Sequence, residues 1–341
     1  MTVPIRGVLL LGCVLLLVSC DGGDTETGKQ KVIKFKIAHI LTKSTHCHKG
    51  LEYFCQLLRE RSHGMLQPTL YSSGELGDSR ALLEGLQLGM VQIVSAGIAP
   101  LSAFDSRLML CDLPFLFENH QHAQRVLDGD IGRRIAADLP GKAGMRVLAY
   151  WVSGFRSVFN TKGPIKSIDD LKGLKIRVAE TPVHIDAFNA LEAIPTPMAF
   201  GELYMSLAQG VVDAADNDAD AFWSQRFYEV CKYYSLTKHS YTAIPLTISE
   251  KFYQSVPAEL RDVIQQAAYD ARDYERQMAR QMNEEALKNL EKVGVKINSV
   301  DTTAFREAMA SIYRKYEKDI GVDILQAVLS GQSDMDSELS Y

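Results

Sequence analysis

The stretch SIDDLKGLKIRVAETPVHIDAFNALEA, residues 167–193, carries the signals of a strand and of a helix in one short segment. Ser167 and Asp170 stand three residues apart, which is typical of a capped helical turn. Residues 174–178, LKIRV, predict a strand. The helix predicted over 182–193 begins with a proline, which suits a first helical turn. A strand followed directly by a helix is the repeating unit of an α/β fold.

The same alternation extends in both directions along the chain. Residues 32–40 alternate apolar residues with lysines, which predicts a strand with one buried face. The other predicted elements are strands over 66–74, 91–97, 144–151, 211–217 and 241–249, helices over 48–64, 78–89, 200–210 and 302–319, and a polar tail. The first half predicts an α/β domain with a mostly parallel sheet, and the second half repeats the pattern. A helix predicted from Pro257 to about Val293 would span roughly 55 Å, so we expect it to brace two domains.

The N-terminus predicts an exported lipoprotein. Arg6 is the only charge before an uncharged, mostly apolar run over 7–18, which is shorter than the roughly 20 residues that span a membrane and fits a secretory signal. The run ends in the letters LVSC, which resemble a lipobox. We therefore expect residues 1–19 to be removed, Cys20 to carry a diacylglycerol, and residues 20–31 to form a flexible tether.

Composition and cysteine spacing exclude several classes of protein. A net charge of −5 at pH 7 argues against a nucleic-acid partner, because a basic footprint is missing. Hydrolase, zinc-protease and P-loop motifs are absent from the sequence, so an enzyme is not expected. The cysteines of the mature domain show no pairing or metal spacing and are expected as buried small residues: Cys47, Cys55, Cys111 and Cys231.

Several ordered motifs identify a family. They are G-x-R at Gly154 and Arg156, S-I-x-D-L-K-G-L-K-I-R-V over 167–178, P-T-P-M-A-F over 195–200, E-L-Y-x-x-L-x-x-G-V-V-D over 202–213, and Asn217. Upstream, SSGELGDSRALLEGLQLG (72–89) and CDLPFLF (111–117) fit the same pattern. Together these motifs resemble the substrate-binding (P) subunit of TRAP transporters, the DctP-like family, over essentially the whole chain from about residue 32.

The resemblance implies a two-lobed fold like that of periplasmic binding proteins. Two α/β domains with central mixed sheets would be joined by hinge strands and braced by the long C-terminal helix, with the ligand cleft between them. The implied boundaries are 32–152 plus about 242–280 for domain I, and 153–241 plus about 281–330 for domain II.

The resemblance also implies an organic acid as ligand and names the residues that would hold it. Arg177, at the end of the K-[IL]-R-V strand, would take the carboxylate through its planar fork. Arg156 matches a second contact, Asn217 matches the asparagine of the family's Q-E-N-P segment, and Phe200 matches an aromatic position. His184 lies on the helix expected to border the cleft and is expected to line the pocket.

The segment THCHKG, residues 45–50, places two histidines around a cysteine, and all three are ligand types for zinc or copper. Neighbouring helical side chains point about 100° apart, so they cannot converge on one ion from a regular helix. Ser44 or Thr45 can cap the following helix. Instead of a metal site, we expect a loop at the cleft with His46 or His48 as a polar contact.

Departures from the family pattern point to the kind of acid. The family's Q-E-N-P segment is here ADND (215–218). Ser79 stands where the family pattern has an acidic residue, and Gln92 stands where it often has an aspartate. With fewer polar matches in the first domain, the pocket would favour a larger or more apolar monocarboxylate. Candidate apolar wall residues are Trp151, Phe155, Tyr204 and Trp223.

The expected partners follow from the same resemblance. They are the small and large TRAP membrane subunits and, in some related systems, a tetratricopeptide-repeat lipoprotein. The lipid would hold the protein at a periplasmic membrane face, the inner membrane rather than the outer one, because Asp21 follows Cys20. No cofactor is expected, although some members bind a cation beside the ligand, for which Asp216 is a weak candidate.

Two other readings of the sequence stay open at this point. The chain could serve a different class of importer, or it could be a surface lipoprotein that has lost transport.

Overall fold

The computed structural model describes Met1 and residues 32–338. The predicted signal peptide, the tether and the lipidation site at Cys20 lie outside the described residues. From Val32 onward the chain forms one compact unit. None of the helices described in this unit is long and apolar enough to cross a membrane.

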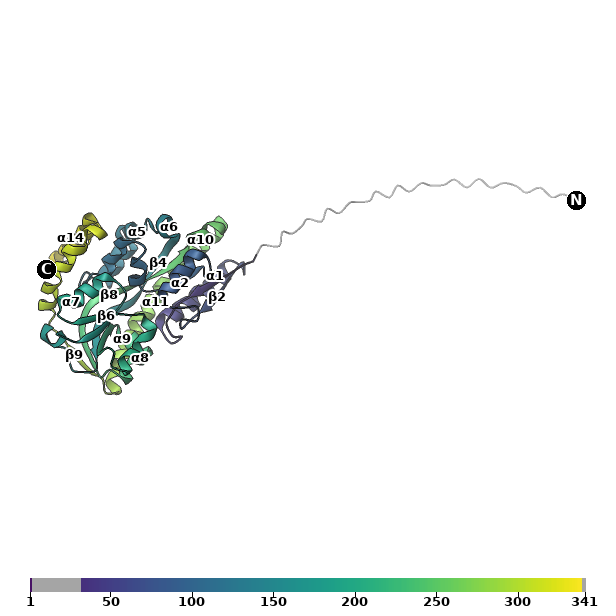
Figure 1. Ribbon diagram of the computed structural model, residues 1–341. Coiled ribbons are helices and arrows are strands. Elements are labelled where there is room, and N and C mark those ends of the chain that lie inside the picture. The colour runs from purple at the N-terminus through teal and green to yellow at the C-terminus, as the bar shows by residue number, and fades with distance from the viewer. Residues whose placement is uncertain (2–31, 339–341) are drawn as a thin grey trace. The chain divides into compact units, whose positions relative to one another are not determined.

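A mixed sheet of nine strands organises this unit, in the order β2-β1-β3-β8-β4-β7-β5-β6 with β9 paired to β8 (Figure 1). β1 is parallel to β2 and β3, and β5 is parallel to β6 and β7. β8 is antiparallel to β3 and β4, and β4 is antiparallel to β7. The strands are Ile33–Ala38 (β1), Leu66–Tyr71 (β2), Ile93–Ser95 (β3), Met145–Asn160 (β4), Lys175–Val178 (β5), Ile194–Pro197 (β6), Ala214–Asn217 (β7), Tyr233–Ser249 (β8) and Lys296–Ser299 (β9).

The two expected domain sheets are therefore one continuous sheet, because β4 and β8 carry the hydrogen bonding from one half to the other. These strands have 16 and 17 residues, about twice the predicted lengths. Both are buried almost throughout, so they lack the polar alternation that marks a strand with one solvated face. Gly154, with a φ of 153°, also interrupts the pattern of β4. A Cβ there would lie 2.9 Å from the Cβ of Asp218, so only glycine lets β4 pass this close.

The long helix α11 (Ala258–Lys292) confirms the predicted brace. Its 35 residues span about 52 Å. It packs on α1 (His46–Arg61), which follows β1 in one half of the sheet, and on α9 (Ala219–Ser224), which follows β7 in the other. The other helices before α11 are Ser79–Leu88 (α2), Ile98–Ser102 (α3), His120–Asp128 (α4), Asp130–Ala136 (α5), Leu139–Ala143 (α6), Pro182–Ala190 (α7), Leu203–Ala208 (α8) and Glu250–Ser255 (α10), with 3-10 turns at Ser106–Asp112 (η1), Ile168–Leu171 (η2), Phe200–Glu202 (η3) and Phe227–Glu229 (η4).

The C-terminal segment differs from its prediction. The helix expected over 302–319 is broken into α12 (Thr303–Ala308) and α13 (Ala310–Ile320), and the expected polar tail forms a further helix, α14 (Val322–Glu338) (Figure 1). The start of α14 carries Ile324, Leu325 and Val328, which are buried in the main apolar cluster. This helical spacing of apolar residues was not recognised because the C-terminal end of the segment is polar.

Candidate ligand-binding pocket

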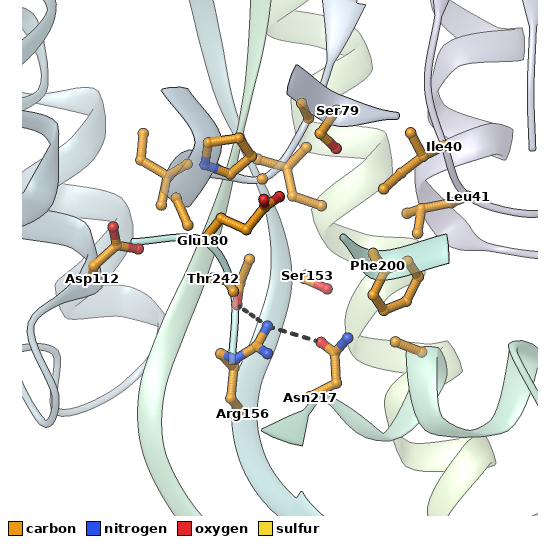
Figure 2. A pocket seen from close by; sticks show the side chains of 18 of the residues that line it. Ile40, Leu41, Ser79, Asp112, Ser153, Arg156, Glu180, Phe200, Asn217 and Thr242 are labelled. Carbon is orange, nitrogen blue, oxygen red and sulfur yellow. Dashed lines mark hydrogen bonds between the residues drawn. The ribbon is translucent and has the colours of Figure 1, made fainter. Parts of the chain in front are cut away.

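A cavity of about 120 Å³ opens at the carboxyl ends of the parallel strands (Figure 2). This edge of an α/β sheet is where ligands bind, because the loops that leave the strands there form a crevice. The segments after β1 and β3 supply one wall, and β5, β7 and the segments after β5 and β6 supply the other. Residues that line the cavity include Ile40, Leu41, Cys47, Asp78, Ile98, Pro100, Asp112, Arg156, Arg177, Glu180, His184, Phe200 and Asn217.

Arg177 brings a buried positive charge to this cavity. Its side chain is only 4% exposed, and its Nε and Nη2 donate to the carbonyl oxygen of Met198 at 3.0 and 2.8 Å. Burial, together with the neighbouring charge of Arg156, lowers the pKa of Arg177 to about 10. No carboxylate among residues 32–331, whose side chains the structure describes, forms a direct salt bridge with Arg177, although the charges of Asp216, Glu180 and Glu202 favour its charged form.

Arg156 lies in the same cavity, but its charge is already matched. Its Nε and Nη2 donate to the two carboxylate oxygens of Asp216 at 2.6 and 2.9 Å. Its Nη1 donates to Asn217 Oδ1 at 3.2 Å and to Thr242 Oγ1 at 3.3 Å (Figure 2). These bonds therefore hold the Arg156 guanidinium in place in the same cavity as Arg177.

The same bonds show where Asp216, the weak candidate for a cation ligand, lies. Both of its oxygens are taken by Arg156, and Nε2 of His239 lies 3.1 Å from Oδ2. Although burial opposes its charge, Arg156 holds the pKa of Asp216 well below its usual range. In the part of the chain that the structure describes, no group of three or more His, Cys, Asp or Glu side chains could hold a metal ion.

Five of the six predicted contact residues line the cavity: Arg177, Arg156, Asn217, Phe200 and His184. Phe200 lies beside Arg177, with 5.8 Å between its ring centroid and the guanidinium carbon. The structure thus brings together side chains that the family motifs distribute over some sixty positions of sequence.

His46, the sixth predicted contact, does not line the cavity, and this expectation is corrected. Its Nδ1 lies 2.7 Å from Oε1 of Glu275 on α11, and its Nε2 lies 3.6 Å from Oδ2 of Asp220 on α9. Burial opposes a charge on His46, but Glu275, with Asp220 and Asp218, outweighs burial and raises the pKa of His46 to about 9. His46 is thus part of a buried ion pair that links three helices.

The rest of the THCHKG segment is also accounted for without a metal. Thr45 caps α1 by accepting from the backbone N–H of His48. The Cys47 thiol lines the cavity 3.3 Å from Ser95 Oγ, and His48 Nδ1 lies 2.9 Å from His39 Nε2. The segment is the first turn of a helix rather than a loop, and its side chains point to different partners.

The apolar wall was assigned to the wrong residues. Trp151 is buried in the core beneath the sheet, and Tyr204 bonds to Glu229 away from the cavity. Trp223 and Phe155 line other hollows. Besides Phe200, the apolar lining includes four residues from the segments after strands β1 and β3, for which no role was predicted: Ile40, Leu41, Ile98 and Pro100.

Asp112 is one of the cavity-lining residues for which no role was predicted. It lies in the CDLPFLF segment at the end of η1, is 2% exposed, and lines the cavity. Its Oδ1 lies 3.7 Å from Nε2 of His184 on α7, which is too far for a hydrogen bond. Burial raises the pKa of Asp112 to about 7, and the nearby Thr181, Arg156 and Ser102 oppose this only in part.

Replacing Asp112 with asparagine should change how stability depends on pH. A carboxyl whose pKa is raised on folding holds its proton more tightly in the folded state, so stability falls as the pH rises from about 4 to about 7. The variant cannot ionise, so relative to wild type it should gain on the order of 2–4 kcal/mol between pH 4.5 and pH 8. Urea unfolding of the ligand-free proteins at several pH values measures the gain.

Asp105→Asn is a control of opposite sign for that experiment. Asp105 is paired with Arg107 and Lys142, which hold its pKa below its usual range although burial opposes them. Its contribution to stability is present above the unfolded pKa and is lost as the pH falls, so this variant should be destabilised most at high pH. If Asp112→Asn and wild type instead gave parallel stability curves, the raised pKa of Asp112 would be wrong.

A two-lobed α/β fold with a cavity at its strand ends, lined by a buried arginine that has no direct salt bridge among residues 32–331, is the architecture of a solute-binding protein that takes an anionic ligand. The comparisons agree. The chain belongs to the bacterial extracellular solute-binding protein family 7 (DctP), whose profile matches residues 37–319.

Similar proteins include the 2,3-diketo-L-gulonate-binding periplasmic protein YiaO of Escherichia coli K12, which is 34% identical over 82% of this chain and 87% of its own length. The galactonate complex of the sugar acid binding protein DctPAm from Advenella mimigardefordensis has a TM-score of 0.86 at 32% identity, over 89% of this chain and 99% of that one. A TRAP periplasmic solute-binding protein from Sulfurospirillum deleyianum with bound succinate has a TM-score of 0.82 at 29% identity, over 87% and 98%. The predicted family and fold class are confirmed, and these relatives are binding proteins rather than enzymes.

Proposed function

We propose that this protein binds an organic acid with one carboxylate and delivers it to the membrane subunits of a TRAP transporter. The observation that supports the proposal is the buried guanidinium of Arg177, which forms no direct salt bridge with a carboxylate among residues 32–331. A ligand carboxylate would supply the missing charge and match the planar fork. Arg156, Asn217, Phe200 and His184 are proposed as further contacts around it.

The charges and the apolar wall favour a monocarboxylate over a small dicarboxylate. Arg156 is already paired with Asp216, so of the two arginines that line the cavity only Arg177 lacks a salt bridge to a carboxylate among residues 32–331. A second ligand carboxylate would meet the carboxyl groups of Asp78, Asp112 and Glu180, which all line the cavity. The apolar wall suits a hydrocarbon portion of the ligand. The relatives named above bind carboxylates of several kinds, which supports the carboxylate but not a particular acid.

Native mass spectrometry of protein purified without refolding tests this function, because a ligand that is carried along can be released and identified. A thermal-shift panel of organic acids tests the preference, and we expect monocarboxylates to give the largest shifts. A panel led by C4-dicarboxylates would contradict the preference. If no acid were released and none shifted the melting temperature, a surface lipoprotein without transport would be the better reading.

We also propose that the protein is attached to a membrane through a lipid on Cys20, at the periplasmic face of the inner membrane. The LVSC motif supports the anchor, and the Asp21 that follows supports the inner membrane. Labelling cells with a radioactive fatty acid tests the anchor. If the Cys20→Ser variant were still labelled, a lipid on Cys20 would be excluded. A tetratricopeptide-repeat lipoprotein is proposed as an additional partner, to be tested by co-purification from detergent-solubilised membranes.

The proposed division into lobes uses the boundaries 32–152 plus about 242–280, and 153–241 plus about 281–330. β4 and β8 would then act as the hinge that closes the lobes on the ligand. Small-angle scattering with and without ligand tests this, since a radius of gyration that does not decrease on binding would contradict closure.

A further inference from the structure

A second hollow, of about 660 Å³, lies beside the two long strands β4 and β8. Ser153 of β4 lines both this hollow and the ligand-binding cavity, but Arg177 and the other proposed ligand contacts do not reach it. The residues that border it come from segments far apart in the sequence: 117–120, 153–157, 234–238, 279–287 and 299–306. The site is thus built by the folded chain and has no counterpart in any single sequence motif.

Three positively charged side chains border this hollow: Lys238 on β8, Arg280 on α11 and Arg306 on α12. None of the three side chains forms a hydrogen bond or a salt bridge with residues 32–331, and the guanidinium carbon of Arg306 lies 4.6 Å from the ring centroid of Phe115. Single unpaired cations are ordinary on a protein surface. Three of them around one concave site are unusual in a chain with a net charge of −5, and a concave site concentrates their field.

Two carboxylates also border the hollow, Glu118 and Glu284, so the local excess is one positive charge, from three cations and two anions. The charge of Glu118 acts on His122, whereas the charges that act on His120 are those of Arg280 and Lys238. The part of the hollow next to His120 is therefore positive.

His120 adds a polar group to this positive part of the hollow. Burial, together with the charges of Arg280 and Lys238, lowers the pKa of His120, so its ring is neutral at pH 7. The Nδ1 atom is buried and has no hydrogen-bond partner among the described residues. A neutral imidazole carries one N–H, which can donate to an oxygen of an anion.

The position of Lys238 is set by a bulge in β8. The register of β8 against β4 shifts here, so that residues 236–239 lie opposite a single residue of β4. Lys238 has a φ of 43°, in the left-handed region that favours glycine. The next residue, His239, holds the bulge from its other side, with Nε2 3.1 Å from Oδ2 of Asp216. Strained backbone of this kind persists where the surroundings fix it and is common at ligand-binding sites.

We propose that this hollow is a second binding site, for a small anion that carries two or three carboxylate or phosphate groups. Lys238, Arg280 and Arg306 stand on three different elements, so an anion with several charged groups would pair with more of them than an anion with one. The two arginines present planar forks that match carboxylate and phosphate oxygens. This inference goes beyond the proposed function, because it does not involve Arg177.

Isothermal titration calorimetry of the full mature protein with citrate and with pyrophosphate tests the site, at a constant ionic strength of about 0.15 M. At least one of the two should bind with a dissociation constant of about 1 mM or lower, and the comparison distinguishes carboxylate from phosphate groups. Arg280→Gln and Arg306→Gln should each weaken this binding about tenfold or more, because a charge-assisted hydrogen bond is lost.

Arg314→Gln is the matched control, because Arg314 is an exposed arginine on α13 that does not border the hollow. This variant should keep the wild-type affinity. A second measurement reports on the place of binding. The ring signals of His120 in NMR spectra, identified by their loss in His120→Asn, should shift when the anion is added to wild type and should shift much less in Arg280→Gln.

Two results would refute the site: no binding of either anion by wild type at up to about 10 mM, or an equal loss of affinity in Arg314→Gln and Arg280→Gln. A third result would place the anion elsewhere. If binding were lost in Arg177→Met but kept in Arg280→Gln and Arg306→Gln, the anion would occupy the ligand-binding cavity. The second site would then be wrong, while the proposed function would stand.

Discussion

Replacing Arg177 with methionine should abolish ligand binding without unfolding the protein. A buried guanidinium that pairs with a ligand carboxylate contributes about 2–5 kcal/mol to binding, so an acid that binds wild type should lose about 30- to 4,000-fold in affinity. Stability should change little, because methionine removes a buried charge that lacks a direct salt bridge as well as two hydrogen bonds to the Met198 carbonyl. Calorimetric titration and urea unfolding measure the two effects separately.

Lys175→Met is the matched control for that experiment. It removes a positive charge from the same strand, two residues earlier, where the side chain is exposed. Its affinity should remain near that of wild type. Arg177→Lys should lie between the two, since lysine keeps the charge but loses the planar fork. If Arg177→Met bound the acid within about threefold of the wild-type affinity, Arg177 would not be the residue that holds the ligand carboxylate.

The sequence predicts strands well where one face of the strand is solvated. β1 was found from its alternation, and its exposed lysines mark the pattern. β4 and β8 were shortened, since burial on both faces removes that alternation. β6, with the sequence IPTP, was missed because two of its four residues are prolines, which are tolerated there only because β6 is an edge strand. The continuity of the sheet depends on the full lengths of β4 and β8, so it could not be predicted.

The pocket was predictable where a residue type and a motif agree. Arg177 ends a predicted strand and has the chemistry that a carboxylate needs, so its place at the cavity was expected. Asp112 was part of a quoted motif but received no role, because its chemistry arises from burial beside His184, which lies far away in sequence. His46 was assigned to the cleft because its actual partner cannot be recognised from the sequence. Its true partner, Glu275, is on α11, and no local pattern connects the two.

Replacing Glu275 with alanine should produce a large loss of stability. Glu275 is fully buried, its Oε1 lies 2.7 Å from His46 Nδ1, and its Oε2 accepts from the backbone N–H of Val152 on β4 at 3.2 Å. Removing one partner of a buried ion pair leaves the other charge unpaired, which costs about 3–5 kcal/mol. Urea unfolding should show this loss, whereas Glu285→Ala, at an exposed position of the same helix, should change stability by less than about 0.5 kcal/mol.

A double-mutant cycle and the pH dependence distinguish the ion pair from simple loss of packing. If the pair is the cause, His46→Leu with Glu275→Leu should be more stable than the sum of the two single changes predicts, because no charge of this pair is then stranded. The pKa of His46 is raised to about 9, so its contribution is fully present below its unfolded pKa of about 6.5 and is lost as the pH rises through 9. Wild type should therefore lose more stability than the double variant between pH 7 and pH 9.5. Additive single changes together with parallel pH curves would show that His46 and Glu275 contribute by packing alone, and that the link between α1 and α11 is not electrostatic.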